Sequence, residues 1–135
     1  MPEARVVWQE GLRFEAHTQS GHKVIIDSSV GENSGPGPME LVLVALAGCT
    51  AMDVMYVMRK QRQPVTGLEV VIKAERAAEH PRVYTGYKLT YIVRGEGVDR
   101  KAVERAVNLS EGKYCSVGAM LGHAAPIEHE IRLEA

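Results

Sequence analysis

Cysteine is scarce in this sequence of 135 residues, which contains only Cys49 and Cys115. Neither lies in a CxxC pair, and the five histidines are scattered, so the chain lacks the spacing of a zinc site. Permanent disulfides are rare in a reducing cytosol. The two thiols are therefore either buried, inert side chains or reactive groups. We expect no metal ion and no other cofactor.

Excess charge and a targeting segment are also missing. Lysine and arginine number 16 against 17 acidic residues, which gives a net charge of -1. Such a balance provides no basic field for nucleic acid or an anionic membrane. The first ten residues, MPEARVVWQE, carry charge and no long apolar stretch, unlike a signal peptide. We expect a cytoplasmic protein without a nucleic-acid or membrane partner.

Residues 41–52 contain no charged side chain, but this run is short of the roughly 20 residues that cross a bilayer. Pro38, Glu40 and the stop at Pro64 predict one helix over residues 38–61. A helix that is apolar on every side must be buried on every side. Because a small domain has little surface to cover it, we predict burial against the same helix of a second subunit, in a homodimer.

Segments of alternating polarity surround this helix and predict strands. Strands are expected over residues 3–9, 12–17, 23–27, 67–77, 84–94 and 126–134. A helix from Asp99 is expected to break at Gly112, and a shorter one to cover residues 115–121. Because strands come in blocks rather than in strict alternation with helices, the sequence predicts an α+β fold in a single domain, residues 1–135. His129, on the apolar side of the last strand, is interpreted as a satisfied or edge histidine.

The surroundings of the two cysteines favour redox chemistry. Gly48 precedes Cys49 inside the long helix, where glycine costs about 1 kcal/mol relative to alanine. This suggests a close approach to the backbone, by a ligand or by another helix. Cys115 is expected near a helix N-terminus, where free N–H groups lower a thiol pKa, and Lys113 would act in the same direction. A thiolate can attack a peroxide to give a sulfenic acid, which a second thiol converts to a disulfide.

An arginine held by a carboxylate would support such a site. Glu40 is the candidate carboxylate, but it lies nine residues before Cys49, about 13.5 Å along the helix. Any link must therefore pass through another side chain or through substrate. Arg13 is the candidate arginine. The plain alternatives are that Arg13 is a solvated arginine on a strand and that Glu40 only complements the helix dipole.

Four segments resemble the OsmC/Ohr superfamily, and within it the YhfA-like branch. They are GPGPMEL (residues 35–41), AGCTAMDV (47–54), ERAV with LS (104–107 and 109–110) and KYCSV (113–117). The resemblance implies an intertwined homodimer, with two long central helices wrapped by antiparallel sheets and active sites at the subunit interface. It also implies reduction of organic hydroperoxides, and less well of hydrogen peroxide, by a thiol reductant. Cys49 would be the peroxidatic cysteine and Cys115 the resolving one.

The sequence departs from the better-known members of this superfamily at the start of the helix. Their glutamate follows a proline and lies ten residues before the cysteine, a position that Met39 occupies here, with Glu40 one step later. No motif decides whether Arg5 or Arg13 matches their arginine. A second hypothesis therefore stays open: an OsmC-like dimer that binds a small molecule and has little or no peroxidase activity.

Overall fold

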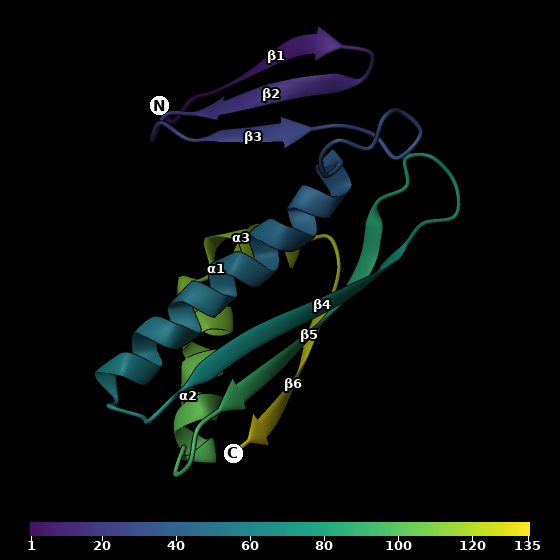
Figure 1. Cartoon of the computed structure of the whole chain (residues 1–135). Coiled ribbons are helices and arrows are strands. Elements are labelled where there is room, and N and C mark those ends of the chain that lie inside the picture. Colours follow the sequence, from purple (N-terminus) through teal and green to yellow (C-terminus); the bar gives the residue numbers. More distant parts are fainter. The chain divides into compact units, whose positions relative to one another are not determined.

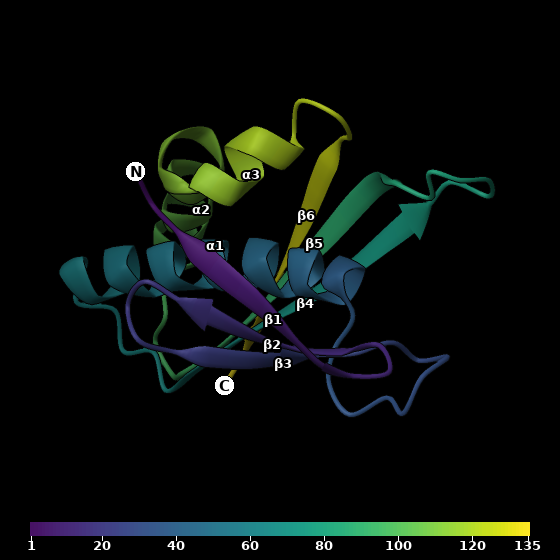
Figure 2. The ribbon, with the colours of Figure 1, turned by 90° about the horizontal axis from the view of Figure 1, so that it is seen from above.

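The first part of the chain is a three-stranded sheet. A computed structural model describes residues 1–135, which divide into two compact units, Met1–Val42 and Leu43–Ala135. In the first unit β1 (Ala4–Glu10), β2 (Arg13–Thr18) and β3 (Lys23–Ile26) pair as an antiparallel meander. The three strands lie side by side in Figures 1 and 2. This confirms the three strands expected from the alternation of polar and apolar residues.

The loop after β3 is organised by the buried carboxylate of Asp27. It accepts hydrogen bonds from the Ser34 hydroxyl at 2.6 Å, the Ser28 amide at 2.7 Å and the Ser34 amide at 3.1 Å. These bonds, that of the Ser34 hydroxyl first, lower the pKa of Asp27. A Cβ atom on Gly35 would collide with the Ile25 carbonyl, so only glycine fits there. The loop thus has a fixed shape just before the long helix begins.

The second unit contains the greater part of the long helix and a second sheet. α1 covers Pro38–Lys60, and β4 (Gly67–Arg76) and β5 (Tyr84–Arg94) form an antiparallel pair. α2 (Arg100–Leu109) and α3 (Ser116–Leu121) then lead to β6 (Ile127–Glu134), which pairs with β5 in parallel. The second sheet is therefore mixed rather than wholly antiparallel. The reason is that a helical connection lets the chain return to the far side of β5 in the same direction.

The core of this unit lies between one face of the sheet and the helices α1 and α2, as Figure 1 shows. Its strand residues alternate along β5, which confirms the predicted periodicity of two. The buried members are Val54, Met58, Leu89, Tyr91, Val93, Val103, Ala106, Val107 and Ile131. Their contacts fix the inner face of α1 relative to the sheet, and this face carries residues of the candidate site.

α1 is buried on one side only in the single chain. Leu46, Thr50, Val54 and Met58, four residues apart, are all at most 1% exposed. The opposite side carries an outer stripe, which we define as Val44, Gly48, Met52 and Tyr56. Its three large side chains are 63%, 76% and 61% exposed, respectively. By length and hydropathy alone α1 could also cross a membrane, but Val54 and Met58 belong to the core. The expectation of burial on every side is not met within one chain.

The connection between α2 and α3 differs from the prediction. Gly112 does not break the helix, because residues Ser110–Tyr114 continue it as a π-helical turn, η1. The Cys115 amide closes this wide turn by donating to the Ser110 carbonyl at 2.8 Å. Cys115 then takes an extended conformation, with ψ of 97°, and becomes the N-cap of α3. Single π turns inside helices are frequent at functional sites.

Candidate active site around Cys49 and Cys115

The structure brings the two cysteines together although they are far apart in sequence. The sulfur atoms of Cys49 and Cys115 and a carboxylate oxygen of Asp53 all lie within 4.8 Å of one another. Cys49 and Asp53 lie on one side of α1 because they are four residues apart. Both cysteines are free thiols; Cys49 is half-buried and Cys115 is only 4% exposed. The arrangement can therefore form a disulfide after a small movement.

Cys115 is held as a neutral thiol. Its burial, and then its contact with Cys49, raise the pKa of Cys115 to about 11. The Gly118 amide donates to its sulfur at 3.2 Å and lowers the pKa, but burial has the larger effect. Lys113 lies over the ring of Tyr114, 5.3 Å from its centroid. The expectation of a lowered pKa at this helix start is therefore wrong, because it neglected burial.

A chain of buried hydroxyl groups starts at Asp53. Its carboxylate accepts a hydrogen bond from the Ser110 hydroxyl at 3.0 Å. The oxygen atoms of Ser110 and Thr50 are 2.8 Å apart, and those of Thr50 and Tyr91 are 2.7 Å apart. Each of the three hydroxyl-bearing residues is at most 1% exposed. We call Ser110, Thr50 and Tyr91 the hydroxyl chain.

The other end of the hydroxyl chain reaches a glutamate and a histidine. The Tyr91 hydroxyl donates to Glu111 at 2.7 Å, and the second oxygen of Glu111 lies 3.0 Å from Nδ1 of His129. The ring of His129 also meets that of Tyr91 edge to face, with centroids 6.1 Å apart. Burial, as the main cause, raises the pKa of Tyr91 far above its ordinary range, so its hydroxyl stays protonated. His129 is thus a satisfied histidine on an edge strand, as interpreted from the sequence.

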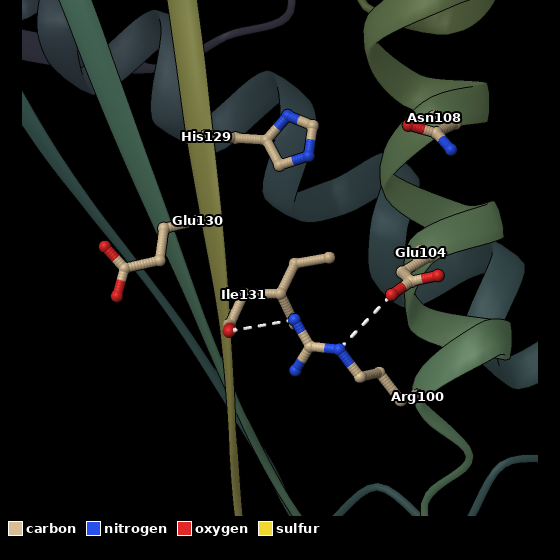
Figure 3. Close-up of a pocket in the computed structure, with 6 residues that line it drawn as sticks. All are labelled: Arg100, Glu104, Asn108, His129, Glu130 and Ile131. Carbon is tan, nitrogen blue, oxygen red and sulfur yellow. Dashed lines mark hydrogen bonds and ion pairs between the residues drawn. The ribbon is translucent and has the colours of Figure 1, made fainter.

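Two pockets open on the ends of this arrangement. A cavity of 210 Å³ has Cys115, Glu111 and Thr50 in its wall, together with apolar side chains that include Leu46 and Leu89. A separate pocket of 370 Å³ lies between α2 and β6 and contains His129. Figure 3 shows it, with the imidazole of His129 in the same pocket as the guanidinium of Arg100. The cavity beside Cys115 can receive a small, largely apolar molecule. The pocket between α2 and β6 connects His129 with solvent.

The other predicted site residues have partners in the first unit. The Arg13 guanidinium donates to the Gln9 side chain at 2.7 Å. Glu40 accepts a hydrogen bond from the Gly37 amide at 3.1 Å, and so caps the start of α1. Arg5 lies in β1, opposite His17 of β2. These contacts correspond to the plain alternatives weighed for Arg13 and Glu40.

Sequence reasoning missed the polar residues around the cysteines. Thr50 and Asp53 carried a signal, since they interrupt an otherwise apolar helix near Cys49. Ser110 and Glu111 had none, because their inward direction depends on the π turn. Cys49, Asp53 and Cys115 could together offer a soft metal ion two sulfur ligands and one oxygen ligand. Metal binding there would occupy the same thiols that a disulfide needs.

A long core helix over a mixed sheet, with two thiols brought together beside its inner face, defines a protein of the OsmC/Ohr type. The OsmC-like protein family matches residues 31–130, and the chain belongs to this family. It is 44% identical over 133 residues to Protein YhfA of Escherichia coli K12, which covers 98% of both chains.

Solved structures show the same fold. A hypothetical protein from Aquifex aeolicus VF5 is 31% identical, with a TM-score of 0.85, over 100% of this chain and 98% of its own. An organic hydroperoxide resistance protein OsmC from Legionella pneumophila, also described as a predicted redox protein, is 14% identical, with a TM-score of 0.68. It covers 100% of this chain and 97% of its own, and it shares the fold.

Proposed function

We propose that this protein is a thiol-dependent peroxidase that reduces organic hydroperoxides, and less well hydrogen peroxide. The observation that carries the proposal is the separation of at most 4.8 Å between the sulfur atoms of Cys49 and Cys115. Inert thiols in a protein core are not expected to lie next to each other beside a carboxylate and a cavity. The name of the Legionella structure supports this chemistry in the family, while the name YhfA specifies no activity.

Peroxide reduction would take three steps, and a fourth would regenerate both thiols. The Cys49 thiolate attacks the terminal oxygen of R–O–O–H, the O–O bond breaks, and a sulfenic acid and an alkoxide form. The alkoxide takes up a proton and leaves as the alcohol. The Cys115 thiol then attacks the sulfenic sulfur, so that a disulfide and water form. A small thiol or dithiol reductant restores both cysteines by thiol–disulfide exchange.

The neutral state of Cys115 suits the resolving role. The Cys115 thiol can remain protonated until the sulfenic acid has formed, because its proton then leaves with the sulfenic hydroxyl group as water. The 210 Å³ cavity beside Cys115 is lined mainly by apolar side chains, which favours an organic substituent over water. These features support organic hydroperoxides as the preferred substrates.

The test is peroxide treatment of the reduced protein followed by mass spectrometry. One equivalent of cumene hydroperoxide should produce the Cys49–Cys115 disulfide in the wild type. Cys49→Ser should consume no hydroperoxide, whereas Cys115→Ser should form a sulfenic acid that dimedone traps. Equal consumption by the wild type and Cys49→Ser would exclude the mechanism.

We also propose that the protein works as a cytoplasmic homodimer in which the outer stripe of α1 packs against the same stripe of a second copy. A Cβ atom on Gly48 would meet nothing within 4 Å in the single chain. The presence of glycine inside the helix, despite its low helix propensity, therefore fits a close approach by a partner helix. To act as the supporting arginine and carboxylate in this assembly, Arg13 and Glu40 would have to give up their contacts with Gln9 and Gly37.

A second candidate function is binding of a small apolar molecule with little or no peroxidase activity. The observation that favours it is Glu40, whose carboxylate is engaged as a helix cap. If hydroperoxide leaves both thiols free in the wild type, this candidate replaces the peroxidase.

A further inference from the structure

The links between Asp53 and Glu111 are all short. Four hydrogen bonds join the two carboxyl groups through Ser110, Thr50 and Tyr91, with oxygen–oxygen distances of 3.0, 2.8, 2.7 and 2.7 Å. Every one of these distances is within the normal range for an O–H···O hydrogen bond. The three hydroxyl groups are buried, although Thr50 and Glu111 also line the cavity beside Cys115.

The hydroxyl chain has fewer hydroxyl protons than it has links. Each link needs one proton, so the four links need four. Ser110, Thr50 and Tyr91 each contribute one, and an ionised carboxylate only accepts. With both carboxyl groups ionised, one link would bring two oxygen lone pairs together in a buried site, which is costly. All four links can carry a proton only if the fourth proton resides on Asp53 or on Glu111.

The fourth proton has two possible placements in the hydroxyl chain. When it is on Asp53, every hydroxyl group donates in the direction of Glu111. When it is on Glu111, every hydroxyl group donates in the direction of Asp53. A short shift of each proton along its own hydrogen bond converts one arrangement into the other. The net result is transfer of one proton between the two carboxyl groups, with Tyr91 neutral before and after.

The two ends have different surroundings. The Asp53 carboxylate lies within 4.8 Å of both sulfur atoms and also lines a pocket with Tyr56, Lys60 and Tyr114. Glu111 contacts His129, whose side chain is 33% exposed. Besides Glu111 and Tyr91, the titratable or charged side chains in the pocket around His129 are Arg100, Glu104 and Glu130 (Figure 3). One end thus faces the thiols and the other faces solvent.

We propose that Ser110, Thr50 and Tyr91 form a proton relay from His129 and Glu111 to Asp53, and that Asp53 protonates the alkoxide released at Cys49. This role rests on the proposed peroxidase function. Asp53 would lose its proton to R–O⁻, which becomes R–OH. His129 in its imidazolium form would then give its Nδ1 proton to Glu111 and keep the proton on Nε2. The three hydroxyl groups would turn to donate toward Asp53, and one shift along the hydroxyl chain would restore the proton on Asp53. His129 would recover its proton from solvent.

The shared proton can be tested without any peroxide. Infrared spectra of the reduced wild type near neutral pH should contain the C=O stretching band of a protonated carboxylic acid. Tyr91→Phe should lose this band, because the remaining hydroxyl groups can satisfy each carboxylate without a fourth proton. Tyr87→Phe is the matched control, since Tyr87 is also buried in β5, and it should keep the band. Absence of the band from the wild type would overturn the proposal.

The relay itself is tested by the rate of sulfenic acid formation in stopped flow. General acids typically contribute 100-fold or more to rates, so we expect Tyr91→Phe to be slower by about 100-fold and Tyr87→Phe to be unchanged. Thr50→Val, which breaks the middle of the chain, should behave like Tyr91→Phe and serves if that variant does not fold. Wild-type rates in both variants would refute the relay. A wild type that has the band but forms no disulfide would instead refute the peroxidase function.

Discussion

The buried thiol of Cys115 should make the protein less stable as the pH rises from 9 to 11. In the unfolded chain this thiol ionises near its ordinary pKa of 9.0, whereas burial raises the pKa in the folded protein to about 11. Between these values the folded state binds more protons than the unfolded state, so the free energy of unfolding falls with increasing pH. The contribution is fully present below pH 9 and is lost above about pH 11.

The size of this effect follows from the two pKa values. A difference of two pH units corresponds to at most about 2.7 kcal/mol. We expect about half of that, since the neighbouring Cys49 is only half-buried and admits solvent to the site. This is roughly a seventh of a typical free energy of unfolding of about 10 kcal/mol, which urea unfolding can measure.

The assay is urea unfolding of the reduced wild type and of Cys115→Ala over this pH range. Lysine and tyrosine residues also titrate there, so the informative quantity is the difference between the two proteins. The wild type should lose about 1–2 kcal/mol more than Cys115→Ala between pH 8 and pH 11. A difference that stays constant with pH would refute the assignment of Cys115 as a buried neutral thiol.

Two further predictions concern α1. Met52→Glu places a charge in the middle of the outer stripe, 76% exposed in the single chain, and should convert a dimer into a folded monomer in sedimentation velocity. A wild type that is already monomeric would contradict the proposed assembly. Met58→Ala removes a core side chain that is 1% exposed and should lower the free energy of unfolding by about 2–5 kcal/mol in urea. A loss below about 1 kcal/mol would show that Met58 is not in the core.

Local patterns predicted most elements of the fold, for reasons that act along the chain. Pro38 and Pro64 limited α1 because proline suits the first turn of a helix and cannot continue one. The alternation of Tyr87, Leu89, Tyr91 and Val93 predicted β5, whose buried face it forms. Nothing in the sequence of residues 126–134 indicated that β6 runs parallel to β5, since strand direction depends on the connection that precedes it.

The helix from Asp99 shows where local signals misled. Gly112 has a low helix propensity, yet it lies within a π turn that the Cys115 amide closes on Ser110. In this turn the buried Ser110 hydroxyl forms hydrogen bonds with Thr50 and Asp53. The Glu111 carboxylate accepts a hydrogen bond from Tyr91. Contacts between α1, β5 and η1 thus outweigh the propensity of one residue.

The sequence by itself determined the α+β class, the segments of strand and helix, the family and the two cysteines as the candidate reactive groups. These depend on periodicity, on turn chemistry and on short motifs, which are written in consecutive residues. Only the tertiary structure decided that the two sulfur atoms meet beside Asp53, that Cys115 is neutral and that three hydroxyl groups join two carboxyl groups. Distance, burial and proton sharing arise between segments that are far apart in the chain, so no local pattern can specify them.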